Sequence, residues 1–133
     1  MKKKLFFLFS ICLLSACQTE IYYSRSIVND TDLDIDLVFL NQNSTEEPDT
    51  IRLDARSTTI IEDYHELDSP KEAKSCAPER DRIVLKVSGF QALLRKDFFN
   101  DDNWENYISG NRSKEQDCYF EINEDNLLLY NGS

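Results

Sequence analysis

The sequence predicts a mainly β fold, an antiparallel, immunoglobulin-like β-sandwich with at most one short helix. From Ile21 onward, apolar and polar side chains alternate along the chain, which is the pattern of a strand with one buried face. About eight short stretches of this kind are separated by turn-forming residues, and little of the sequence has the repeat of a helix. Many short strands with little helix are typical of two packed sheets.

The first half of the domain is predicted to contain four strands. In the clearest one, Leu33, Ile35 and Leu37 are expected to point into the core while the aspartates between them face water. The loop that follows is polar and contains a proline. The four strands are predicted at 22–28, 32–37, 50–53 and 57–62, with turns at 29–31 and 54–56 and a loop at 41–49.

The second half begins with a long connection over residues 67–80, which contains two prolines, many charges and Cys76. A β-branched run then leads into Ser88-Gly89, which has the composition of a two-residue hairpin turn. The remaining elements are predicted as hairpin strands at 82–87 and 90–95, one or two helical turns at 101–108, and a closing pair of strands at 118–122 and 127–130.

The N-terminus has the three parts of a secretory signal. Lysines are followed by an apolar run over residues 5–14 and then by Ser15, Ala16 and Cys17. The apolar run is well short of the roughly 20 residues that a membrane-spanning helix needs. Leu-Ser-Ala-Cys at this point resembles the bacterial lipobox, whose cysteine receives lipid before the signal is removed. We therefore predict a signal peptide over 1–16 and lipidation of Cys17.

The lipid is predicted to hold the mature chain on a membrane of the bacterial cell envelope. More than one acyl chain makes such anchoring stable, because each buried methylene contributes about 0.8 kcal/mol. Position 18 is Gln, so the inner-membrane retention signal of enteric bacteria is absent, and residues 18–20 partly match a surface-export signal of Bacteroidota. We expect the outer membrane, with residues 17–20 as a tether and 21–133 as a single β-rich domain facing the periplasm or the cell surface.

The mature chain is strongly acidic. Removal of residues 1–16 takes away three lysines and no acidic residue, which leaves 12 Lys and Arg against 25 Asp and Glu and a formal net charge of −13. Such a surface repels the phosphates of nucleic acids and anionic lipid headgroups. We therefore predict no nucleic-acid partner, and we expect an envelope protein or a glycan instead. The ordinary interpretation of the acidity is a solvated surface, and an acidic binding patch is the alternative.

Two cysteines remain for pairing in the mature domain. Cys12 leaves with the signal and Cys17 is predicted to carry lipid, so Cys76 and Cys118 are left in an oxidising compartment. A disulfide between them would constrain the unfolded chain by about 4 kcal/mol in the loop-entropy model. Two free thiols or a metal pair are the alternatives, but the CxxC or histidine spacing of a zinc site is absent.

Four stretches carry a resemblance that covers nearly the whole mature chain. They are Ile-Val-Asn-Asp-Thr at 27–31, Ile-Val-Leu at 83–85 leading into Ser88-Gly89, Asn106-Tyr107, and Cys-Tyr-Phe-Glu-Ile at 118–122. Their order is similar to that in small uncharacterised lipoproteins of Bacteroidota. The resemblance implies an envelope location and a β-rich domain, with no established activity and no functional residues to carry over.

A calcium site and any other cofactor are not predicted. Asp30, Asp32 and Asp34 have the spacing of an EF-hand loop, but Ile35 stands where that loop needs glycine and Asn41 where it needs a bidentate glutamate. We therefore predict a solvated strand face. A second group of carboxylates has no recognisable calcium frame: Asp97, Asp101 and Asp102.

Catalysis is not predicted either. A nucleophile needs a base and an oxyanion pocket, and the chain has one histidine, His65, and no G-x-S-x-G elbow. His65 is expected to be exposed in a loop beside acidic residues. Paired carboxylates for glycoside cleavage remain an alternative, because their separation is not visible in a sequence.

Two further surface features are hypotheses. The aromatic residues Phe98, Phe99, Trp104 and Tyr107 alternate with amide and acid groups, as in a platform that stacks on a sugar or peptide, although aromatics in a small domain more often form the core. Asp-Thr-Ile at 49–51 resembles the triplet to which Bacteroidota attach O-glycans.

Three functions remain open. The first is a non-catalytic binding or structural module of the envelope with a surface patch for a protein or glycan. The second is a protective lipoprotein that neutralises a toxin or inhibits a hydrolase, for which an acidic face would meet a basic target. The third is a small hydrolase, which would depend on a specific acid or on His65.

Overall fold

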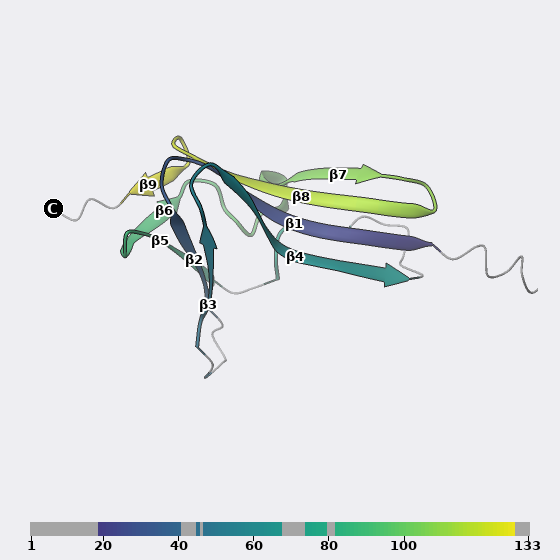
Figure 1. Cartoon of the computed structure of the whole chain (residues 1–133), viewed down its shortest axis with the longest axis horizontal. Helices are drawn as coiled ribbons and strands as arrows, with labels where there is room; N and C mark the ends of the chain where they lie inside the picture. Colours follow the sequence, from purple (N-terminus) through teal and green to yellow (C-terminus); the bar gives the residue numbers. More distant parts are fainter. Residues whose placement is uncertain (1–18, 41–44, 46, 68–73, 80–81, 130–133) are drawn as a thin grey trace, which may run out of the picture.

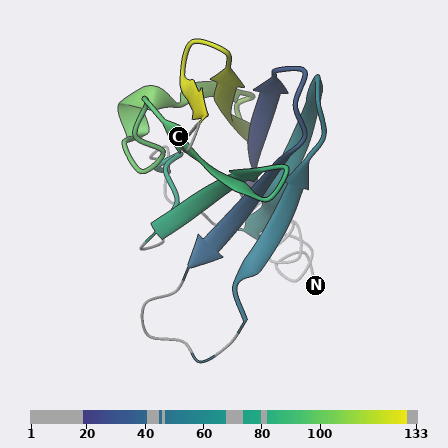
Figure 2. The same cartoon turned by 90° about the vertical axis from the view of Figure 1, so that its left-hand side faces the viewer.

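Two β-sheets pack against each other in this domain (Figures 1 and 2). The computed structural model describes residues 19–40, 45, 47–67, 74–79 and 82–129. The four-stranded sheet has the order β4-β1-β8-β7, and the five-stranded sheet has the order β3-β2-β5-β6-β9. In the described part of the chain the elements are β1 Glu20–Asp30, β2 Ile35–Leu40, β3 Asp49–Leu53, β4 Ser57–Leu67, β5 Arg82–Val87, β6 Phe90–Leu94, the 3-10 turn η1 Asp101–Asn103, β7 Glu105–Ser109, β8 Ser113–Asn123 and β9 Leu127–Leu129.

The predicted mainly β sandwich is confirmed, with one departure from antiparallel order. β1 and β8 run parallel, with Ser24 opposite Asp117, whereas the other neighbouring strands described are antiparallel. A parallel pair cannot be closed by a tight turn and needs a long connection. Here the connection is most of the domain, since β1 comes first and β8 next to last.

A corner joins the two sheets. β1 continues into β2 through residues 31–34, and β3 continues into β4 through residues 54–56, so two paired strands turn together from one sheet into the other (Figure 1). The buried side chain of Asn29 lies inside this corner. Its amide nitrogen donates to the backbone carbonyls of Leu33 (2.8 Å), Leu53 (3.1 Å) and Asp54 (3.1 Å).

The corner corrects one predicted strand. The predicted strand at 32–37 begins only at Ile35, and Leu33 is 37% exposed instead of pointing into the core. The reason is the hydrogen bond from Asn29 to the Leu33 carbonyl, which holds this part of the backbone in the bend. Ile35 and Leu37 are fully buried, as the alternation predicted.

The β5–β6 hairpin is confirmed. Ser88 and Gly89 both have positive φ angles, 51° and 81°. These angles are those of a type I′ turn, whose twist matches that of the strands on either side. Gly89 suits this position because a residue without Cβ adopts positive φ without steric cost.

Two predictions for the last third of the chain need correction. Of the one or two helical turns predicted at 101–108, one forms, the 3-10 turn η1, and the rest is the strand β7, which pairs with β8. β8 and β9 do not pair with each other, because β9 joins the five-stranded sheet beside β6. All five residues of β7 are exposed, so this edge strand has no apolar alternation that a sequence could display.

Aromatic side chains fill the core between the sheets. Phe98, Trp104 and Phe120 pack on one another with ring centroids 5.0–5.3 Å apart. Phe98 and Trp104 are 3% and 6% exposed, and Phe99 packs against the same cluster. The aromatic platform suggested by the sequence is therefore mostly core, and Tyr107 alone of its four rings is exposed.

The predicted disulfide is present. Cys76 and Cys118 are bonded, and both are buried in the core. The bond closes a separation of 42 residues and fastens the segment 74–79 to the middle of β8. Closing a loop of this length stabilises the fold by about 4 kcal/mol in the loop-entropy model.

Candidate binding face

The side of the four-stranded sheet turned away from the core presents a broad polar surface. Tyr22 and Ser24 lie on it, because the alternate residues Tyr23 and Arg25 are buried on the opposite side. The strand register adds the residues beside them. We call this surface the outer face; it consists of Glu20, Tyr22, Ser24, Ser26 and Val28 of β1, Thr58, Ile60, Asp63, His65 and Leu67 of β4, Glu105, Tyr107 and Ser109 of β7, and Ser113, Glu115, Asp117, Tyr119 and Glu121 of β8.

Two stacked rings stand on the outer face. The rings of Tyr22 and His65 are nearly parallel, with an interplanar angle of 10° and centroids 4.3 Å apart. The carboxylate of Glu20 lies beside both, 3.4 Å from the Tyr22 hydroxyl and 3.7 Å from His65 Nε2. His65 therefore belongs to a strand, not to the loop that the sequence predicted.

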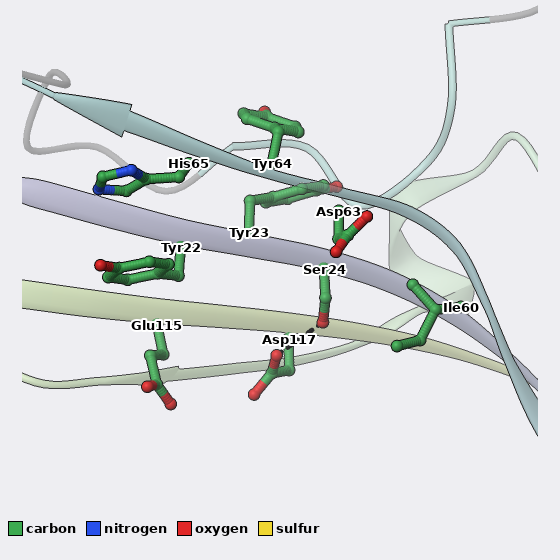
Figure 3. A pocket seen from close by; sticks show the side chains of 9 residues that line it. All are labelled: Tyr22, Tyr23, Ser24, Ile60, Asp63, Tyr64, His65, Glu115 and Asp117. Atoms are coloured by element: carbon green, nitrogen blue, oxygen red, sulfur yellow. Dashed lines mark hydrogen bonds between the residues drawn. The ribbon is translucent and has the colours of Figure 1, made fainter.

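Carboxylates surround a shallow hollow next to this stack. Figure 3 shows Tyr22 between His65 and Glu115, and Ser24 between Asp63 and Asp117, which agrees with the strand register. The Ser24 hydroxyl donates to Asp117 at 2.6 Å. The hollow has a volume of about 360 Å³ and is lined by Tyr22, Tyr23, Ser24, Ile60, Asp63, Tyr64, His65, Glu115 and Asp117.

A second aromatic pair lies on the outer face, with one ring on β7 and the other on β8. The rings of Tyr107 and Tyr119 meet edge to face with centroids 5.8 Å apart, and Tyr107 is 57% exposed. The Tyr107 hydroxyl donates to the Glu105 carboxylate at 2.8 Å. This hydrogen bond to an anion raises the pKa of the Tyr107 phenol above its ordinary value.

The carboxylates around the hollow, those of Asp63, Glu115 and Asp117, form no salt bridge with the residues that the structure describes. The outer face holds six carboxylates and no lysine or arginine, and His65 is its one side chain that can carry a positive charge. The carboxylates belong to Glu20, Asp63, Glu105, Glu115, Asp117 and Glu121.

The aspartates of the corner are in a different situation. The Arg56 guanidinium lies 2.6 Å from Asp30 and 3.0 Å from Asp32, and it lowers the pKa of Asp32 through a side-chain hydrogen bond. Arg52 lies 2.8 Å from Asp34. The residues that suggested an EF-hand loop are solvent-exposed, as predicted, but they form ion pairs at a bend and do not all lie on a strand.

The opposite side of the same sheet is closed by internal contacts. The Arg25 guanidinium pairs with Glu62 and donates to the Tyr23 hydroxyl at 2.9 Å and to the Ser75 carbonyl at 3.4 Å. Its Nε donates to the Cys76 carbonyl. Burial raises the pKa of the Tyr23 phenol. Arg25 thus holds the disulfide-bearing segment against the sheet.

Asp101 fixes the same segment from the other side. Its Oδ1 accepts hydrogen bonds from the backbone of Cys76 (2.6 Å) and Ala77 (3.0 Å) and from the Ser75 hydroxyl (3.1 Å). These bonds, that from Ala77 above all, lower the pKa of the Asp101 carboxyl. Asp101 therefore has a structural role. Asp97, which the sequence grouped with it, accepts from the backbone of Phe99.

A second hollow lies beside the disulfide-bearing segment and is more polar. It has a volume of about 500 Å³ and contains two cationic side chains. Both are already paired, Arg25 with Glu62 and Lys74 with Glu66 at 2.6 Å. Internal pairing leaves this hollow with little charge to offer a ligand, and the outer face is the stronger candidate.

The predicted lipidation site lies outside the described residues, and the described residues contain no candidate metal site and no candidate membrane helix. Cys17 and the signal peptide lie outside the described residues, and β1 begins at Glu20, the last residue of the predicted tether. Within the described ranges there is no group of three His, Cys, Asp or Glu residues that would hold a metal ion. Over the same ranges, no helix has the length and apolar character to cross a membrane.

The outer face itself was not predicted. The carboxylates around the hollow come from strands far apart in the sequence, β4 and β8, and meet because both strands pair with β1. The signal in the sequence is the acidic and aromatic residues at alternate positions of β1, β7 and β8, such as Glu20 and Tyr22. Comparison of the chain with family models, curated proteins and solved structures finds no match.

Proposed function

We propose that this chain is a lipid-anchored, non-catalytic binding module of the bacterial cell envelope, and that the outer face is its binding surface. The observation that carries the proposal is the hollow beside Tyr22, where exposed rings and unpaired carboxylates lie together. Unpaired charges and exposed aromatic rings gain free energy when a complementary partner covers them. The same groups contribute little to the stability of the domain alone.

The contacts of the hollow favour binding over catalysis. Ser24, the hydroxyl nearest the carboxylates, donates its hydrogen to Asp117 and has no bond to a histidine. His65 is stacked on Tyr22, and its Nε2 faces Glu20. A nucleophile needs a base to take its proton, and the one histidine is turned to other partners.

The proposed anchor fits the orientation of the sheet. Cys17 precedes the start of β1 by three residues, which span at most about 10 Å when extended. β1 begins at the end of the four-stranded sheet that is farthest from the five-stranded sheet (Figure 1). Lipid on Cys17 would hold that end near the bilayer, and the outer face would then stand upright beside it.

Photo-crosslinking in the native host tests the binding surface. A photoreactive phenylalanine at Tyr22 or Tyr107 is expected to yield a crosslinked adduct in whole cells. The matched control is the same replacement at Leu93, a 47% exposed side chain of the five-stranded sheet. Equal adduct yields at Leu93 and at the two tyrosines, or no adduct at any of them, would contradict the outer face as the binding surface.

A second function is favoured by the charge of the outer face. A protective lipoprotein that neutralises a toxin or inhibits a hydrolase would use six carboxylates without lysine or arginine to meet a basic target. Identifying the crosslinked adduct separates the two. A resident envelope protein favours the binding module, whereas a secreted toxin or enzyme favours the protective role.

A further inference from the structure

We propose that the outer face binds a basic, extended segment of a partner protein and seats an arginine side chain in the hollow beside Tyr22. This inference rests on the proposed function and adds the chemistry of the partner. It follows from three features of the hollow: its uncompensated charge, the orientation of its rings and the spacing of its carboxylates.

The charge of the hollow selects a cation. Asp63, Glu115 and Asp117 have no salt-bridge partner among the described residues, whereas the corner aspartates are paired with arginines. The carboxylates around the hollow repel one another, and a basic partner would reduce this repulsion. The same charge repels nucleic acid and anionic lipid, so a basic protein segment is the partner that fits.

The rings favour a guanidinium over a sugar. His65 covers one face of the Tyr22 ring at 4.3 Å, and the two rings are almost parallel. The other face of Tyr22 is consequently directed toward β8 and Glu115 (Figure 3). A sugar would need a ring face open to solvent, but a planar guanidinium fits edgewise between Tyr22 and Glu115. There it would stack on the ring and pair with the carboxylate.

The spacing of the carboxylates suits an extended segment. Glu115 and Asp117 are alternate residues of one strand, so they are separated by about 7 Å along β8. Alternate side chains of an extended peptide have the same separation, about 7 Å. Asp63 lies two strands away, about 10 Å across the sheet. A segment with arginine at every second position would therefore place successive guanidinium groups against successive carboxylates.

Peptide binding to the purified full-length lipoprotein in detergent tests this inference. The probe is a fluorescent peptide of alternating arginine and threonine, and its negative counterpart has glutamate in place of arginine. The arginine peptide is expected to bind, more weakly when NaCl is raised from about 0.05 to about 0.5 M. The glutamate peptide is expected not to bind. Absence of arginine-peptide binding at low salt would overturn the inference.

Paired variants separate the hollow from the general acidity of the protein. Asp63→Asn with Asp117→Asn is expected to lower the affinity for the arginine peptide about tenfold. The control, Glu124→Gln with Asp125→Asn, changes the net charge equally in an exposed turn away from the outer face. It is expected to keep the affinity within about twofold. Equal losses in both variants, each with an unchanged melting temperature, would overturn the proposed site.

The ring contact has its own variants. Tyr22→Leu is expected to weaken binding of the arginine peptide several-fold, and Tyr22→Phe is expected to retain it, because the ring face supplies the contact. Equal affinities for Tyr22→Leu and the parent protein would overturn the seating of arginine on Tyr22. Photo-crosslinks from Tyr107 to a partner that lacks basic segments would keep the proposed function and overturn only this inference.

Discussion

At the scale of single residues, two charged side chains organise the segment at 74–79: Arg25, which is buried, and Asp101, which lies at the surface. Arg25 and Asp101 hold opposite sides of the segment that carries Cys76, one through its carbonyls and the other through its N–H groups. The buried charge of Arg25 would be costly if it were not paired and hydrogen-bonded. Each side chain hydrogen-bonds backbone groups of this segment, so its removal would take a partner from those groups.

Asp101 predicts a specific pH dependence. The pKa of its carboxyl is lower in the folded protein than its ordinary value of 3.8, so the unfolded chain binds the proton more readily. The stabilisation is complete above that value and is lost as the pH falls through the lower, folded pKa. We expect Asp101→Asn to cost about 1 kcal/mol of unfolding free energy at neutral pH, because its hydrogen bonds weaken. We also expect a smaller fall in stability on acidification.

Thermal unfolding of both proteins between about pH 6 and about pH 2.5 measures this effect. Asp102→Asn is the matched control, because Asp102 is exposed and next to Asp101 in the chain. Parallel curves of melting temperature against pH for Asp101→Asn and the parent protein would contradict the structural role of Asp101.

Single-residue roles were the hardest part to predict from the sequence. Asp101 was grouped with Asp97 and Asp102 as loop carboxylates, and only the folded segment at 74–79 shows which one receives N–H groups. Trp104 belongs to an aromatic stretch that resembles a binding platform in the sequence, but its side chain is buried in the core. Aromatic residues occur both in cores and on binding surfaces, and the residues that bury them in a core can lie far away in the sequence.

At the scale of elements, the corner at Asn29 gives the sandwich its shape. Paired strands turn there from one sheet into the other, and Asn29 distributes its two amide hydrogens over three carbonyls. Its own oxygen accepts from the Thr31 hydroxyl at 2.7 Å and from the Thr31 backbone at 3.2 Å. The asparagine therefore satisfies the backbone groups that the bend removes from the β-ladder.

Replacing Asn29 is expected to be costly. Asn29→Ala removes the donor to three carbonyls, of which that of Leu53 is in a buried hydrogen bond, and we expect a loss of about 2–3 kcal/mol of unfolding free energy. Urea denaturation measures the loss. Asn106→Ala, at an exposed position of β7, is the control and is expected to change the free energy by less than about 0.5 kcal/mol. A loss for Asn29→Ala as small as that for Asn106→Ala would contradict the account of the corner.

Elements with a local signature were predicted well. The β5–β6 hairpin has its turn residues and its alternation within a short stretch, and the structure places it where the sequence did. β7 has no such signature because all its residues are exposed. β9 pairs with β6 and not with β8, a choice made by the packing of the two sheets. Long-range pairing therefore limited the prediction more than strand formation.

At the scale of the whole molecule, the two faces of the four-stranded sheet differ: one is buried against the core and the other is exposed to solvent. The core, the disulfide and Arg25 close the side of the four-stranded sheet that faces inward. On the outer face the rings of Tyr22 and Tyr107 are exposed, and Asp63, Glu115 and Asp117 form no salt bridge with the residues that the structure describes. The alternation of apolar and polar residues predicted a sandwich and the composition predicted an acidic surface, but the concentration of acid on one face depends on the parallel pairing of β1 and β8.

The proposed anchor completes this account, because it would fix how the outer face stands relative to the membrane. The most direct measurement is the intact mass and membrane association of the protein from its host, compared with Cys17→Ala. We predict that the parent protein loses residues 1–16, gains the mass of acyl chains and sediments with membranes. The Cys17→Ala protein is predicted to lose both the lipid mass and the membrane association. A parent protein with the mass of peptide alone, or a Cys17→Ala protein that still sediments with membranes, would contradict the lipid anchor.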